Sequence, residues 1–177
     1  MTHISLHPAT GWANLQRQLS GWALGLMLAL GITQGSWAQA PAAVAVGQAL
    51  PTLSLKDQFD KPWQITPATR LLMFAAGRKA SNLIQGVLQA LPKDQLTRKN
   101  AVYLADMSKM PGFITRTFAL PTLRDMPYQI GVSLDEATLA AWPRQLDAVT
   151  LIELDQNVVK RISYVTKDAD LRAALER

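Results

Sequence analysis

The 177-residue chain contains no cysteine, and both of its histidines, His3 and His7, lie near the N-terminus. Thiol redox chemistry and histidine-assisted nucleophiles need those residue types, so the rest of the chain cannot supply them. Zinc sites, which use cysteine and histidine, are not expected either. Carboxylates, lysine, tyrosine, serine and threonine remain for acid–base chemistry. The nucleotide-binding patterns G-x-G-x-x-G and G-x-x-x-x-G-K-[ST] are absent from the sequence.

The first candidate site lies where a short apolar run ends and a helical pattern begins: Gly77, Arg78, Lys79, Ser81 and Asn82. Strand-to-helix turns of this kind are common ligand sites in α/β proteins, and the start of a helix attracts anions. Two cations there disfavour an isolated helix by about 0.3–1 kcal/mol each. An anionic ligand or an acidic partner would offset that cost. The alternative is that both cations are solvated and that Ser81 caps the helix.

A second candidate site contains Asp106 and Lys109. Asp106 ends another predicted strand at the same edge of the sheet, where Lys109 can lie beside it. The functional interpretation is a polar site, with acid–base chemistry as one use. The alternative is that Asp106 or Ser108 caps the following helix.

Charge is divided unevenly along the sequence. Residues 78–124 carry eight cations against Asp94 and Asp106, whereas residues 125–177 have a net charge of −3. Such a surface suits an anionic ligand or an acidic protein of the cell envelope, or it is simply solvated. Few aromatic residues stand among the cations, so nucleic acid is not expected. Four further side chains either line an apolar groove or pack in the core: Met107, Met110, Met126 and Trp142.

The apolar patterns predict an α/β domain with a mixed sheet, helices on both faces and an N-terminal β-hairpin extension. Strands are expected at Leu50–Leu55, Trp63–Ile65, Arg70–Ala76, Asn100–Ala105, Tyr128–Leu134, Val149–Leu154 and Val158–Val165. A helix follows the third strand. Another begins between Ser108 and Pro111, ends at Pro121 and faces inward through Phe113, Ile114, Thr117 and Phe118. A last helix covers Asp168–Arg177.

Residues 1–38 are predicted to form a cleaved secretory signal. Arg17 precedes an apolar run, Leu19–Ile32, and Ser36-Trp-Ala38 provides a small-residue cleavage site. The run is shorter than the ~20 apolar residues of a spanning helix, so no membrane span is expected after cleavage. The mature domain would be residues 39–177, in the periplasm.

The sequence resembles the thioredoxin-like proteins of the peroxiredoxin and TlpA type. The likeness extends over residues 47–177 and rests on Gly47–Pro51, Leu53–Phe59, Leu71–Ala76 with its following Gly and helix, and Val149–Val159. The sequence is also similar to small exported proteins of the YtfJ type in Phe74–Arg78, Ala101–Asp106 and Met110–Ile114. Some of those proteins are called FAD/FMN-containing dehydrogenases, but no flavin-binding glycine pattern is present and no cofactor is expected.

Two departures limit what the resemblance implies. The redox cysteines of the thioredoxin-like proteins should fall near Gly77–Ser81, and their cis-proline should precede the Val149 strand, where Asp147 and Ala148 stand. The fold is therefore expected without its thiol activity. A non-catalytic binding or structural role in the cell envelope follows, and the alternative is an oxidoreductase that depends on a bound or external cofactor.

Overall fold

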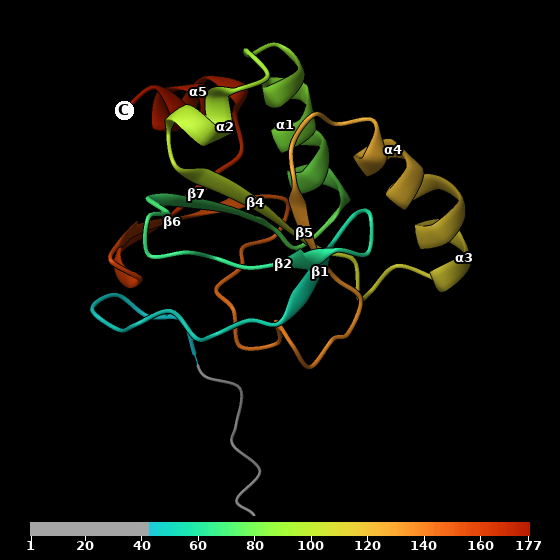
Figure 1. Ribbon diagram of the computed structural model, residues 1–177, viewed down its shortest axis with the longest axis horizontal. Helices are drawn as coiled ribbons and strands as arrows, with labels where there is room; N and C mark the ends of the chain where they lie inside the picture. Colours follow the sequence, from blue (N-terminus) through green and yellow to red (C-terminus); the bar gives the residue numbers. More distant parts are fainter. Residues whose placement is uncertain (1–42) are drawn as a thin grey trace, which may run out of the picture. The chain divides into compact units, whose positions relative to one another are not determined.

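The computed structural model describes residues 43–177, which fold around one seven-stranded sheet in the order β2-β1-β5-β4-β3-β6-β7 (Figure 1). The strands are β1 (Leu55–Asp57), β2 (Pro62–Trp63), β3 (Leu71–Ala75), β4 (Ala101–Asp106), β5 (Ile130–Ser133), β6 (Val149–Asp155) and β7 (Val158–Val165). The helical segments are α1 (Arg78–Gln89), α2 (Gln95–Arg98), α3 (Gly112–Ile114), the π-helical η1 (Thr115–Ala119), α4 (Leu120–Arg124) and α5 (Asp168–Glu176). The predicted signal, residues 1–38, lies outside the described residues. Within residues 43–177, no helix is long and apolar enough to cross a membrane.

The centre of the sheet is β3, whose five residues are all apolar and buried. It runs parallel to β4 and antiparallel to β6, and β4 runs parallel to β5. Parallel neighbours need a crossover connection. The β3–β4 crossover contains α1 and α2, and the β4–β5 crossover contains α3, η1 and α4. The carboxyl ends of β3 and β4 therefore meet at one edge of the sheet, beside the start of α1.

Both predicted hairpins are present. Gln156 and Asn157 connect β6 to β7 with φ angles of 48° and 67°, a left-handed pair that matches the twist of the strands. The N-terminal hairpin pairs β1 with β2, but β1 begins at Leu55 instead of the predicted Leu50. The Leu50 N–H is bonded at 2.8 Å to the carbonyl of Asn157, which holds the preceding segment against the other end of the sheet.

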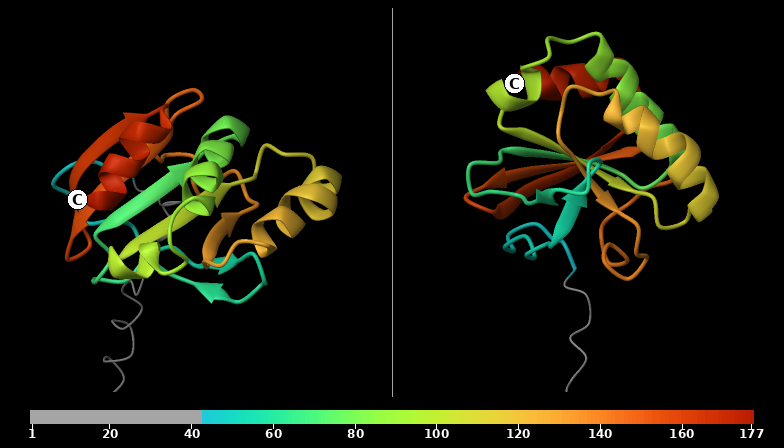
Figure 2. Two further views of the ribbon diagram at one scale, coloured as in Figure 1. Left: turned by 90° about the horizontal axis from the view of Figure 1, so that it is seen from above. Right: turned by 45° about the vertical axis from the view of Figure 1, so that its right-hand side comes forward.

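The two faces of the sheet are covered differently, which corrects one detail of the prediction. The buried apolar side chains of the helices all pack in one core, against one face. The opposite core contains Val44, Leu50, Leu139 and Trp142, which lie in turns and irregular segments. Figure 2 shows the described helices gathered on one side of the sheet. The mixed α/β sheet is confirmed, whereas the helices predicted for the second face are replaced by turns.

The prediction for the helix after β4 was wrong in two respects. The helical segment continues past Pro121 to Arg124, and Phe113 and Phe118 are 70% and 57% exposed instead of buried. Pro121 has no N–H for an α-helical bond to the carbonyl four residues earlier, and the wider π-helical η1 lies directly before α4. A wider turn rotates the residues that follow it around the helix axis. Apolar residues spaced at 3.6 residues per turn therefore do not all face the core. The two rings pack edge-to-face instead, 6.2 Å apart.

Candidate functional site

The start of α1 is fixed from inside the fold by Ser81. The N-cap residue is Gly77, which has no side chain to cap the helix, and the first helical bond runs from the Ser81 N–H to the Gly77 carbonyl at 3.0 Å. The Ser81 hydroxyl lies 2.6 Å from the Tyr103 hydroxyl on β4 and accepts a bond from Gln85 Nε2 at 3.0 Å. The alternative in which Ser81 caps the helix is therefore wrong, because its side chain ties α1 to the sheet.

The hydroxyl of Tyr103 is a poor acid at this site. Desolvation raises its pKa from 10.0 to about 12, although the hydrogen bonds to Ser81 and Gln85 oppose the shift. An effective general acid or base has a pKa near the working pH. Tyr103 is moved away from that range, so the contact between α1 and β4 is structural.

The two cations at the start of α1 differ in their surroundings. Lys79 Nζ lies 2.6 Å from Asp147 Oδ2, in the segment before β6, and both side chains are partly exposed. Asp147 has a φ of 59°, a left-handed conformation that aspartate tolerates better than most residues. Arg78 and Asn82 are exposed and make no side-chain hydrogen bond or ion pair with another residue of the described part of the chain.

Asp106 is ion-paired, but with a residue that the sequence did not indicate. Its Oδ1 accepts bonds from the Ser108 N–H at 3.0 Å and the Ser108 hydroxyl at 2.6 Å, and its Oδ2 accepts one from Arg144 Nη1 at 3.0 Å. Lys109 pairs with Glu136 at 3.8 Å instead of with Asp106. The Asp106 side chain is only 4% exposed, so Arg144 neutralises a nearly buried carboxylate.

Arg144 holds this edge of the sheet together. Its guanidinium donates to the carbonyls of Leu139 and Trp142 and lies over the ring of Phe74, 5.4 Å from the centroid. The residue stands 38 positions after Asp106, outside any local pattern. The sequence offered no signal for this contact.

A groove follows the start of α1. It consists of two neighbouring hollows of about 270 Å³ each, which share Arg78, Ser81, Met107 and Met110 among their lining residues. One hollow extends to Gly77, Asp106 and Lys109, and the other to Asn82 and η1. The fold thus brings the residues of the two predicted sites together along one groove, except Lys79, which lines neither hollow. The sequence left two alternatives, groove or core, for four side chains. Met110 lines the groove, and Met126 and Trp142 pack in the two cores. Met107 does both, because it is 7% exposed, belongs to the core below the helices and borders the groove.

Comparisons with known proteins give a fold but no family. No family model matches the sequence, and no curated protein matches it. A candidate protein disulfide isomerase from Bacteroides thetaiotaomicron superposes with a TM-score of 0.51 at 11% identity, over 75% of this chain and 87% of that chain. A candidate thioredoxin from Neisseria meningitidis gives 0.50 at 16% identity, over 75% and 89% of the two chains. The fold is thioredoxin-like.

In this thioredoxin-like domain, one ion pair joins the two places where the resemblance puts the redox groups. Lys79 lies in the stretch Gly77–Ser81, where cysteines were expected, and Asp147 lies where the cis-proline was expected. The sequence contains no cysteine. The Lys79–Asp147 ion pair therefore lies where the resemblance leads us to expect the redox groups.

Proposed function

We propose that this protein is a non-catalytic binding module whose ligand, an anion or an acidic segment of an envelope protein, lies in the groove beside Arg78. The observation that carries the proposal is that the polar groups able to react are already engaged. Arg144 and Ser108 hold Asp106, and burial moves the pKa of Tyr103 to about 12. What the groove still offers a ligand is the cation Arg78 and a wall that contains Met107 and Met110.

A flavin does not suit this groove. The groove consists of two hollows of about 270 Å³ each and offers no cavity that encloses a cofactor of this size. Glycine-rich phosphate-binding motifs are absent from the sequence. The visible spectrum of the purified protein is expected to lack flavin absorbance.

The proposal includes export. Cleavage after Ala38 would release residues 39–177 to the periplasm, and mass spectrometry should find an N-terminus between Gln39 and Ala43. An intact Met1 in the membrane fraction would contradict cleavage. We also propose a relationship to the exported proteins of the YtfJ type, supported by Phe74–Arg78 and Ala101–Asp106, which contribute residues of β3, α1 and β4 beside the groove.

Anion binding is tested by thermal melting with inorganic phosphate, sulfate and polyphosphate. A ligand that binds only the folded state stabilises it by RT ln(1 + [L]/Kd), about 2.7 kcal/mol at a hundredfold excess over Kd. Arg78→Ala should remove most of the increase in Tm, and the Arg78→Ala, Lys79→Ala double variant should remove all of it. Lys167→Ala is the matched control, because Lys167 is an exposed cation at the start of another helix, α5.

Either of two results would overturn this proposal. The first is the absence of any anion-dependent increase in Tm, and the second is an increase that survives the double variant. Insulin reduction or peroxide consumption above that of a heat-inactivated control would contradict the non-catalytic role.

A further inference from the structure

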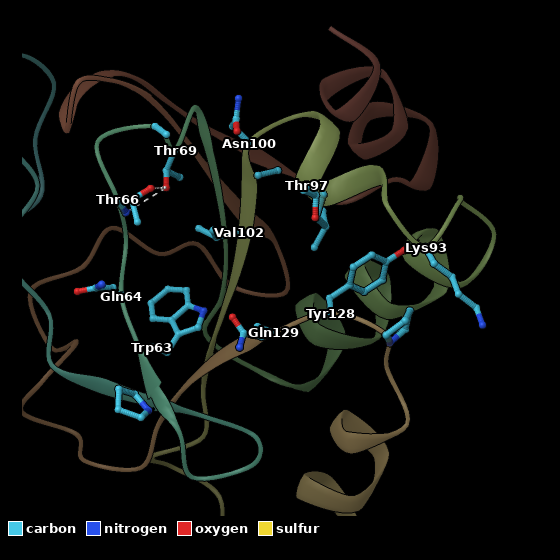
Figure 3. Close-up of a pocket in the computed structure, with 15 residues that line it drawn as sticks. Trp63, Gln64, Thr66, Thr69, Lys93, Thr97, Asn100, Val102, Tyr128 and Gln129 are labelled. Carbon is cyan, nitrogen blue, oxygen red and sulfur yellow. Dashed lines mark hydrogen bonds between the residues drawn. The ribbon is translucent and has the colours of Figure 1, made fainter.

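A larger cavity lies at the opposite edge of the sheet from Arg78. Its volume is about 580 Å³, and its walls come from three places: the segment after β2, the end of α2 with the start of β4, and the segment before β5 (Figure 3). This volume lies within the roughly 300–1,000 Å³ typical of small-molecule sites. The cavity shares no lining residue with the groove beside α1.

Trp63 is a fixed, almost fully buried side chain in the wall of this cavity. Its exposed fraction is 5%. A Cβ built on Gly131 would lie 2.6 Å from atoms of the Trp63 ring, so the indole packs directly on the glycine backbone of β5. The Trp63 ring therefore fits in this position because Gly131 has no side chain.

The indole N–H of Trp63 makes no hydrogen bond with any residue from 43 to 177. Among these residues, the only fully buried side-chain nitrogen or oxygen without a partner is Asp57 Oδ2, so the indole nitrogen remains accessible from the cavity. Figure 3 shows this nitrogen on the side of the ring that faces Gln129. Indole is a donor only. Because its nitrogen opens to the cavity, the Trp63 N–H is free to donate to an oxygen of a ligand placed there.

The lining around Trp63 mixes polar with apolar residues, among them Leu96 and Val102, and is almost uncharged. Thr97 and Gln129 line the cavity with side chains that both donate and accept hydrogen bonds, whereas in Figure 3 the amides of Gln64 and Asn100 point away from Trp63. Lys93 is the only charged residue in the described lining, and in Figure 3 its ammonium points away from Trp63. Amide and hydroxyl side chains of this kind complement the hydroxyl groups of a sugar, which also donate and accept. An anion would find no cation near the indole.

We propose that this cavity binds a neutral mono- or disaccharide, with the Trp63 N–H donating to a sugar oxygen and Gln129 bonding a neighbouring hydroxyl. The Tyr128 hydroxyl already bonds the carbonyls of Leu88 and Pro92, so Tyr128 contributes its ring and not its oxygen. The site is independent of the proposed anion groove. Each can fail without the other.

The test is NMR titration of the full chain, labelled at the indole nitrogens, with N-acetylglucosamine and its β-1,4-linked disaccharide. Binding should move the resonance of the Trp63 indole proton downfield. The resonance of Trp142, which lies in the same core but not in the cavity lining, should not change.

Three variants test which side chains bind the sugar. Trp63→Phe assigns the resonance and, since it removes the donor, should weaken binding about tenfold. Gln129→Ala changes an exposed residue, should preserve the fold and should weaken binding several-fold. Gln145→Ala, an exposed glutamine outside the cavity lining, is the matched control and should have no effect.

Three results would overturn the proposal. One is that neither sugar moves the Trp63 resonance at millimolar concentration. Another is that Gln129→Ala binds like the parent protein. The third is that a neutral amide probe, N-acetylglycine methylamide, moves the Trp63 resonance when the sugars do not, which would assign the cavity to a peptide.

Discussion

The two ends of the parallel β3–β4 pair differ in how their polar groups are satisfied. At the carboxyl ends, Asp106 is bonded to Arg144, Ser81 to Tyr103, and Lys79 to Asp147. At the other end, the indole N–H of Trp63 has no partner among residues 43–177 and borders a cavity of about 580 Å³. The resemblance to thioredoxin-like proteins points to the first end, where the unpaired site residues of the described chain, Arg78 and Asn82, are exposed. At the second end the unpaired donor belongs to a side chain that is almost fully buried.

The largest effect at the carboxyl ends of β3 and β4 is expected for Arg144→Ala. Removing one partner of a buried ion pair leaves the other charge without compensation, at a cost of about 3–5 kcal/mol. Arg144 is 29% exposed and water can partly replace it, so we expect a loss of about 3 kcal/mol in the free energy of unfolding. Urea denaturation at neutral pH measures the loss. Arg78→Ala, at a cation without a partner in the described residues, should change stability by less than about 0.5 kcal/mol. Equal effects of the two substitutions would show that Asp106 does not depend on Arg144.

The burial of the Tyr103 hydroxyl should appear in the pH dependence of stability. Burial raises the pKa of Tyr103 to about 12 from 10.0, so the folded state retains a proton that the unfolded state releases between these two pH values. The resulting stabilisation is complete below pH 10 and is lost as the pH rises to 12, by roughly 2–3 kcal/mol. Denaturant unfolding of the parent protein and Tyr103→Phe at pH 9 to 12 measures the difference. Other tyrosines and lysines titrate in both proteins and cancel. Parallel pH curves for the two proteins would contradict the shift.

Gly131→Ala tests whether the Trp63 ring, beside the cavity, is held tightly against β5. The added Cβ would lie 2.6 Å from the ring, and overpacking of this kind costs about 1–3 kcal/mol. We expect a loss of about 2 kcal/mol by urea denaturation, together with a shift of the Trp63 indole resonance. Gly86→Ala is the matched control, since nothing lies within 4 Å of its added Cβ in α1. It should stabilise the protein by roughly 0.5–1 kcal/mol because glycine is unfavourable within a helix. A Gly131→Ala protein as stable as its parent would show that the indole is free to move.

The sequence predicted the parts of the fold that have local signals. The apolar run predicted β3, and the polar turn residues predicted the hairpin of β6 and β7. Phe113 and Phe118 were assigned to the core because their spacing fits an α-helix, and η1 changes that spacing. A π-helical turn has no sequence pattern as clear as helical periodicity.

The site was predictable in position but not in its contacts. Gly77–Asn82 and Asp106 do meet at one edge, as expected from strands that run parallel. Their ionic partners, Arg144 and Asp147, come from distant parts of the chain, and a single sequence does not show which distant residues pair. The cavity was missed altogether. Gly131, a glycine within a predicted strand, was its one local signal, because such glycines often mark a close approach by another group.

The Lys79–Asp147 pair should give the smallest effect. Ion pairs between exposed side chains contribute about 0–1 kcal/mol, and salt weakens them further. With Lys79 73% and Asp147 43% exposed, we expect a double-mutant cycle of Lys79→Ala and Asp147→Asn to give a coupling of about 0.5 kcal/mol or less at low salt. The coupling should become undetectable in 1 M sodium chloride. A pair this weak allows Lys79 to leave Asp147 and add to the attraction of an anion bound beside Arg78. A coupling above about 2 kcal/mol that persists in salt would instead make the pair structural and would leave Arg78 as the cation that an anion meets at this end of the sheet.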